Sequence, residues 1–121
     1  MLMIRAIIRP EKSPEVLAAL LEAGFPAVTK MDVYGRGRQR GMRVGEVTYD
    51  ELPKELLMIV VHDDDKDFVV DVIAKTSRSG PEGAYGDGKI FVSPIEEVYT
   101  VRTGGRDDIP SAASAALTTE S

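Results

Sequence analysis

The stretch ELLMIVVHDDDKDFVVDVIAKTS, residues 55–77, carries the pattern of a strand followed directly by a helix. Leu56–Val61 is an apolar run too short for a typical helix, so it predicts a strand buried on both faces. The aspartates at 63–65 lie where the positive end of a helix dipole favours negative charge. The apolar residues that follow share one face of a helix expected to end near Ser77: Phe68, Val69, Val72 and Ile73.

The N-terminal third repeats this order. Leu2–Arg9 alternates in polarity, with Leu2, Ile4, Ala6 and Ile8 on one face, which predicts a half-buried strand. Ser13 is expected to cap a helix that has Pro14 at its first position and ends near Ala23, before Gly24. An extended segment over 27–34 follows.

Beyond Ser77, a glycine-rich loop over 79–88 precedes a strand at Ile90–Val92 and an extended segment over 98–102. The resulting βαββαβ order predicts an α+β fold of the ferredoxin-like type, with an antiparallel four-stranded sheet and both helices on one face. The other face would be a large apolar surface, so we expect sister subunits to bury it. One domain over 1–104 and a mobile tail over 105–121, rich in Ser, Ala and Thr, are expected.

Composition limits the function. A net charge of −5 and a pI near 4.9 argue against a general surface for nucleic acid or anionic membrane, so any anion site must be local. The chain has no cysteine, and its apolar runs are too short to insert in a membrane. We therefore expect a cytoplasmic protein.

Two segments could form such an anion site. GRGRQRG at 35–41, with Arg43 close behind, is a cationic island whose glycines leave backbone amides accessible to a phosphate or carboxylate. GDGK at 86–89 leads into a strand and could place amides and Lys89 around phosphates, although it is not a Walker A loop. A solvated hairpin tip and an ordinary Asp-Gly turn would carry the same residues, and an arginine-rich RNA contact is a third reading of the first segment.

Arg102, in the RTG segment at 102–104, could join these loops in a cleft between subunits. Catalytic sets are missing. His62 is the only histidine and is expected near a helix start, and the aspartates around it lack the spacing of a calcium loop. This favours a ligand-binding protein over an enzyme.

Four segments together resemble one family in order and over nearly the whole length to about residue 104: GRGRQRG at 35–41, LPK at 52–54, GDGKIFV at 86–92 and RTG at 102–104. They are similar to the PII nitrogen-regulatory signal-transduction proteins. That resemblance implies a ferredoxin-like homotrimer whose clefts bind ATP or ADP, with a long T-loop over about 36–52.

The resemblance also implies roles for particular positions. Lys54 would pair with a carboxylate of the effector 2-oxoglutarate, and Gln39 would complete the coordination of a Mg²⁺ ion that the keto acid chelates. Within the T-loop, partner contacts would fall on Arg40, Arg43 and Tyr49. The positions that would hold the nucleotide are Thr29, Gly35, Gly37, Arg38, Gln39, Val60, Gly86, Asp87, Gly88, Lys89 and Arg102.

Several positions depart from the family pattern. The T-loop is about four residues shorter than is common, and Val47 stands where many members carry a uridylylated tyrosine, with Tyr49 two residues later. Thr100 replaces one of two arginines near the phosphates. Pro81–Gly83 is an insertion in the second loop.

KMDVYGRG at 30–37, YDELPK at 49–54 and SPIEEVYTVRTG at 93–104 are similar to the nitrogenase-associated branch, NifI. This implies direct control of a nitrogenase component through the T-loop, together with a second PII-like paralogue. Control of an ammonium channel or a nitrogen-assimilation enzyme is an alternative. A small enzyme on a ferredoxin-like scaffold, using His62, is another.

Overall fold

The computed structural model describes residues 1–36 and 51–107. Four strands and two helices form its body: β1 (Leu2–Ile8), α1 (Ser13–Glu22), β2 (Thr29–Gly35), β3 (Leu52–Val61), α2 (Lys66–Ser77) and β4 (Gly88–Pro94). Short elements complete the described part of the chain: the 3-10 helices η1 (Pro10–Lys12) and η2 (Asp63–Asp65), and the strands β5 (Val98–Tyr99) and β6 (Arg106–Asp107).

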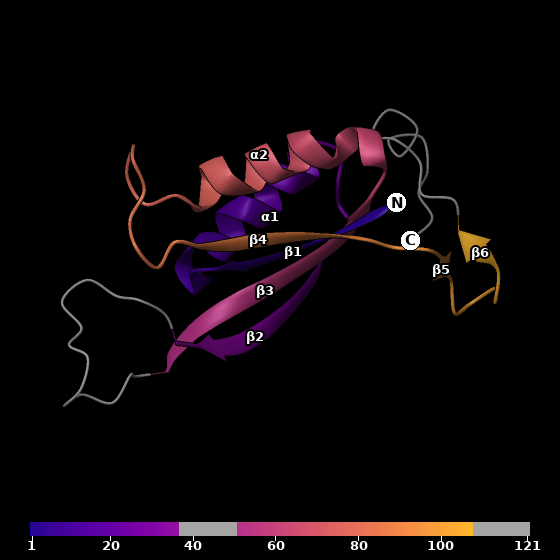
Figure 1. Cartoon of the computed structure of the whole chain (residues 1–121), viewed down its shortest axis with the longest axis horizontal. Coiled ribbons are helices and arrows are strands. Elements are labelled where there is room, and N and C mark those ends of the chain that lie inside the picture. The colour runs from indigo at the N-terminus through magenta and orange to yellow at the C-terminus, as the bar shows by residue number, and fades with distance from the viewer. Residues whose placement is uncertain (37–50, 108–121) are drawn as a thin grey trace.

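The four long strands form one antiparallel sheet in the order β2-β3-β1-β4. Both helices lie on the same face of this sheet, as Figure 1 shows. This is the ferredoxin-like α+β arrangement predicted from the sequence.

The core lies between the sheet and the helices. The alternation predicted for β1 is confirmed, because Ile4, Ala6 and Ile8 are almost fully buried. The helices contribute spaced apolar residues to the same layer. These are Val16 and Leu20 from α1 and Val69 and Ile73 from α2.

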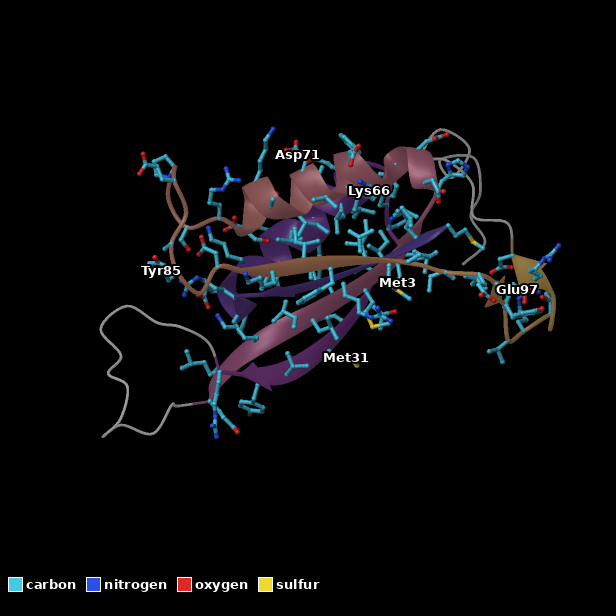
Figure 2. All side chains as sticks on the ribbon, in the orientation of Figure 1. Met3, Met31, Lys66, Asp71, Tyr85 and Glu97 are labelled. Carbon is cyan, nitrogen blue, oxygen red and sulfur yellow. The ribbon has the colours of Figure 1, made fainter. Side chains whose placement is uncertain are left out.

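The prediction that Leu56–Val61 is buried on both faces is wrong for the single chain. In β3, Leu57, Ile59 and Val61 are buried, whereas the residues between them stay partly exposed. The reason is that the helices cover only one face. The side chains on the other face, here called the open face, include Met3, Met31, Leu56, Met58, Val60 and Phe91; Figure 2 labels Met3 and Met31.

Ser13 does not cap α1 as predicted. It has helical backbone angles and is fully buried, and its hydroxyl donates a hydrogen bond of 3.4 Å to Glu55 Oε2. The 3-10 helix η1 precedes it and supplies Lys12 as the flanking residue. In α2, Phe68 is 51% exposed rather than part of the buried stripe, and its ring lies near that of Phe25.

The last described segment is a small hairpin. Of the extended segment predicted over 98–102, only β5 is a strand, because the chain turns at 101–103 and returns as β6. The first residues of the predicted tail, up to Asp107, therefore belong to the hairpin. The remainder, 108–121, lies outside the described residues.

Two adjacent leucines of α1 test this packing. Leu20 is fully buried and Leu21 is 63% exposed. Leu20→Ala should lower the free energy of unfolding by about 2–5 kcal/mol because it leaves a cavity, whereas Leu21→Ala should change it by about 0.5 kcal/mol or less. Urea denaturation of both variants measures this, and equal losses would contradict the burial of Leu20.

Candidate functional site

One end of the sheet gathers six of the nine predicted site residues that the structure describes. The end of β1 pairs Ile8 with Gly88 of β4 on one side and with Glu55 of β3 on the other. Gly35, at the end of β2, pairs with Leu52 at the start of β3. Antiparallel pairing thus brings the loop over 79–88, the end of β2 and the start of β3 to the same end of the sheet (Figure 1).

Two cations from the sheet hold the second loop. Arg9, directly after β1, donates from Nε to Asp87 Oδ1 at 3.0 Å and from Nη2 to the Tyr85 carbonyl at 2.8 Å. Lys54 of β3 donates from Nζ to the Gly86 carbonyl at 2.7 Å. These contacts fix three consecutive loop residues, and we call the two side chains the cationic clamp.

Asp87 is the centre of this loop. Besides the bond from Arg9, its Oδ2 accepts from the backbone amides of Ser79 at 3.0 Å and Ala84 at 2.8 Å. Burial acts to raise the pKa of the Asp87 carboxyl, but the hydrogen bonds from Ser79, Ala84 and Arg9 outweigh it and hold the pKa far below its usual range. Asp87 is therefore an organising carboxylate inside a loop expected to bind anions.

The glycines beside Asp87 are required by geometry. A Cβ on Gly88 would lie 1.9 Å from the Ile7 carbonyl oxygen, and the residue has a φ of +127°. Gly86 has a φ of +91°, and a Cβ there would lie 3.2 Å from Nη2 of Arg9. Both positions need glycine so that the loop can approach β1 and the clamp.

The environment of the Lys54 ammonium group disfavours its charged form. Partial burial, followed by repulsion from the nearby Arg9 guanidinium, lowers its pKa, while Glu11 and Asp87 act in the opposite direction. Its contact with Gly86 joins the residue predicted to bind a carboxylate to the loop predicted to bind phosphates. A ligand carboxylate at Lys54 would compete with, or add to, the bond to the Gly86 carbonyl.

The predicted residues fall into three groups. The first lies together at the end just described: Gly35, Lys54, Gly86, Asp87, Gly88 and Lys89. The second group, Thr29, Val60 and Arg102, does not join the first within one chain. The third lies outside the described residues, so the calls on it stay predictions: Gly37, Arg38, Gln39, Arg40, Arg43 and Tyr49.

Thr29, Val60 and Arg102 form the second group. Thr29 pairs with Met58, and Val60 pairs with Met3, so both lie farther along the open face. Val60 lies six positions along the strand from Lys54, which is about 20 Å of extended chain. Arg102 lies in the turn between β5 and β6 rather than at a strand end; this hairpin is at the other end of the molecule from Tyr85, as the position of Glu97 in Figure 2 indicates.

Arg9 was missed by sequence reasoning. The alternation of Leu2–Arg9 does place it on the open face, together with Met3 and Ile7. Its partner Asp87 is 78 residues away in the sequence, however, so no local pattern connects them.

The residues of the alternative catalytic reading have structural roles. The Asp64 amide donates to His62 Nδ1 at 3.1 Å, so His62 caps η2. Its position near a helix start is thus confirmed. Within residues 1–36 and 51–107, no cluster of three or more acidic or histidine side chains could hold a metal ion.

Replacing the Asp87 carboxylate tests the loop. Asp87→Asn removes the charge that accepts from Arg9 and from the Ser79 and Ala84 amides, so those two amides should exchange at least several-fold faster with solvent. Asp71→Asn, at an exposed ion pair with Lys75 on α2, is the control. Hydrogen exchange followed by NMR measures the rates, and unchanged protection in Asp87→Asn would show that Asp87 does not organise the loop.

The low pKa of Asp87 also predicts a pH dependence. A carboxyl whose pKa is lower in the folded protein than in the unfolded chain stabilises the fold above the unfolded value, and this contribution falls as the pH drops toward the folded pKa. The difference in unfolding free energy between wild type and Asp87→Asn should be constant above about pH 5 and shrink below about pH 4, the ordinary aspartate range. Urea denaturation across this range measures it, and a difference that grows on acidification would contradict the sign.

Neither helix in the described part of the chain is long and apolar enough to cross a membrane. The nitrogen regulatory protein P-II family matches residues 1–105. The chain is 62% identical over 103 residues to the "Nitrogen fixation nifHD region GlnB-like protein 1" of Methanothermobacter marburgensis, covering 85% of this chain and 95% of that protein.

A protein of the same description from Methanococcus maripaludis is 55% identical over 103 residues, again covering 85% of this chain and 95% of that protein. That organism also has a "GlnB-like protein 2", 41% identical over 119 residues, covering 87% of this chain and 95% of that protein. The extent of these matches leads to one conclusion: the chain belongs to the nitrogen regulatory P-II family.

Proposed function

We propose that this chain is a regulatory sensor, not an enzyme, that binds ATP or ADP between the subunits of a homotrimer. The observation that carries the proposal is that the predicted nucleotide residues lie in two separate parts of the folded chain. Gly86, Gly88 and Lys89 lie at one end, and Thr29, Val60 and Arg102 lie away from it. Because Val60 lies about 20 Å along the strand from Lys54 within one chain, a nucleotide that contacts both groups is best accommodated between two copies.

The open face supports the assembly. Its apolar side chains include Met31 and Phe91, which are 44% and 50% exposed in the single chain. A monomer rarely leaves so continuous an apolar surface in water, so packing of the three sheets against one another would stabilise the protein. The same packing would bring one end of a chain beside the other end of its neighbour.

The clamp supports 2-oxoglutarate as the effector. Lys54 already donates to the Gly86 carbonyl, so it is oriented toward the nucleotide loop and can pair with a carboxylate there. Mg²⁺ would neutralise charge between phosphates and keto acid, with Gln39 as the expected protein ligand outside the described residues. Each ligand would then favour the arrangement that the other orders.

The relatives' names support a target in nitrogen fixation. They place those proteins in nifHD regions, and two kinds occur, protein 1 and protein 2. We propose that the T-loop contacts a nitrogenase component and that the chain works with a second PII-like paralogue. Recovery of nitrogenase in a pull-down from nitrogen-fixing cells would support this target. Recovery of an ammonium channel or a nitrogen-assimilation enzyme instead would favour the alternative.

Nucleotide binding can be tested with Lys89→Ala. Removing a charge-assisted phosphate contact should cost about 1.5–3 kcal/mol, a weakening of roughly 10- to 100-fold. Calorimetric titration with Mg-ATP, with and without 2-oxoglutarate, measures affinity and mutual enhancement. Lys66→Ala, at the start of α2, is the control. Unchanged affinity in Lys89→Ala, or no mutual enhancement in wild type, would contradict the proposal.

Mixed trimers test the division of the site between subunits. Lys89→Ala and Arg102→Ala should each bind nucleotide weakly as homotrimers. Co-expressed chains carrying one change each should regain one intact site per mixed trimer, because one junction then joins an unchanged Lys89 to an unchanged Arg102. Stoichiometry from calorimetry on purified mixed trimers measures the rescue, and its absence would place both residues in the same site of one chain.

A further inference from the structure

Arg9 makes two contacts with the second loop, one on each side of Gly86. Its Nη2 donates to the Tyr85 carbonyl at 2.8 Å, and its Nε donates to Asp87 Oδ1 at 3.0 Å. Two donors on one planar guanidinium fix the orientation of the contact as well as its position. The fit is close, because a Cβ on Gly86 would lie 3.2 Å from Nη2.

The bond from Arg9 sets the direction of one backbone amide. The peptide unit between Tyr85 and Gly86 is trans, so its carbonyl and its amide lie in one plane and point in opposite directions. Holding the Tyr85 carbonyl therefore aims the Gly86 amide away from Arg9. That amide has no acceptor among the described residues, whereas the amides of Ala84 and Asp87 are both used inside the loop. The Gly86 amide is thus a donor available to a ligand.

The backbone of Arg9 is itself fixed. Ile8, directly before it, is paired with strands on both sides. Pro10 follows directly and restricts Arg9 to extended angles, in agreement with its φ of −66° and ψ of 136°. The Arg9 carbonyl accepts from the Lys12 amide at 3.0 Å. The guanidinium therefore reaches the loop from a rigid point at the end of the sheet.

We propose that Arg9 is a positioning residue of the nucleotide loop, which aims the Gly86 amide at a phosphate group without touching the nucleotide. This role rests on the proposed binding of ATP or ADP at the loop. An amide that is already oriented loses less free energy to ordering when the phosphate binds. Lys54 differs from Arg9, because the Gly86 carbonyl that it holds orients the Asp87 amide, which already donates to Ala84.

Calorimetric titration with Mg-ATP tests this role in three variants. Arg9→Gln should weaken binding about tenfold, the loss of one oriented hydrogen bond to a charged group. Arg9→Lys keeps the charge but lacks the planar pair of donors, so it should weaken binding to a similar extent. Arg78→Gln, at an exposed arginine beside Gly83 of the same loop, removes an equal charge and should leave the affinity unchanged. Wild-type affinity in Arg9→Lys would show that charge alone matters and would overturn the proposal.

NMR relaxation of the nucleotide-free chain separates this role from nucleotide binding itself. The order parameter of the Gly86 amide should be about 0.8 in wild type and in Arg78→Gln, and should fall to about 0.6 or below in both Arg9 variants. Sheet amide signals that match those of wild type control for loss of the fold. An unchanged order parameter in the Arg9 variants would contradict positioning by Arg9, whatever the affinity for nucleotide. Wild-type protein that binds no Mg-ATP would contradict the proposed function instead.

Discussion

The close approach between Gly88 and the Ile7 carbonyl is the constraint on which the site depends. It lets β4 pair with β1 up to the point where the second loop begins, although any side chain at that position would collide with backbone. Because β1 pairs with β3 on its other edge, the same end of the sheet also receives Lys54. β1 thus positions both the glycine loop and the cations that hold it.

The clamp explains how a glycine-rich loop can have one conformation. Glycine residues can adopt many backbone conformations, so specific contacts must offset the conformational entropy that is lost when they are ordered. Arg9 and Lys54 each donate a hydrogen bond to a carbonyl oxygen of the loop, and the Asp87 carboxylate accepts hydrogen bonds from two of its amides. Amides left free in such a loop are presented in a fixed arrangement, which is the requirement for phosphate recognition.

The sequence predicted the elements better than their ends. The alternation in β1 and the apolar stripes of the helices were enough to predict the fold, because both patterns reflect burial in the layer between the sheet and the helices. The start of β3 was missed, since Pro53 and Lys54 resemble loop residues. The proline is tolerated because pairing with β1 reaches only Glu55, so Pro53 has a neighbour on one side only. Arg9 with Asp87 and Ser13 with Glu55 are contacts across 78 and 42 residues, which no local pattern reveals.

The contacts of the second loop have a thermodynamic consequence. Arg9 and Lys54, which lie outside the loop, hold two of its carbonyls, and Asp87 binds the amides of Ser79 and Ala84. The entropy cost of ordering the glycines is therefore met by contacts within the chain rather than by a ligand. A ligand that bound the remaining amides of such a loop would lose less free energy to ordering than on an unrestrained segment. Arg9 would thus contribute to binding at the loop without touching the ligand, because it sets the arrangement of the amides.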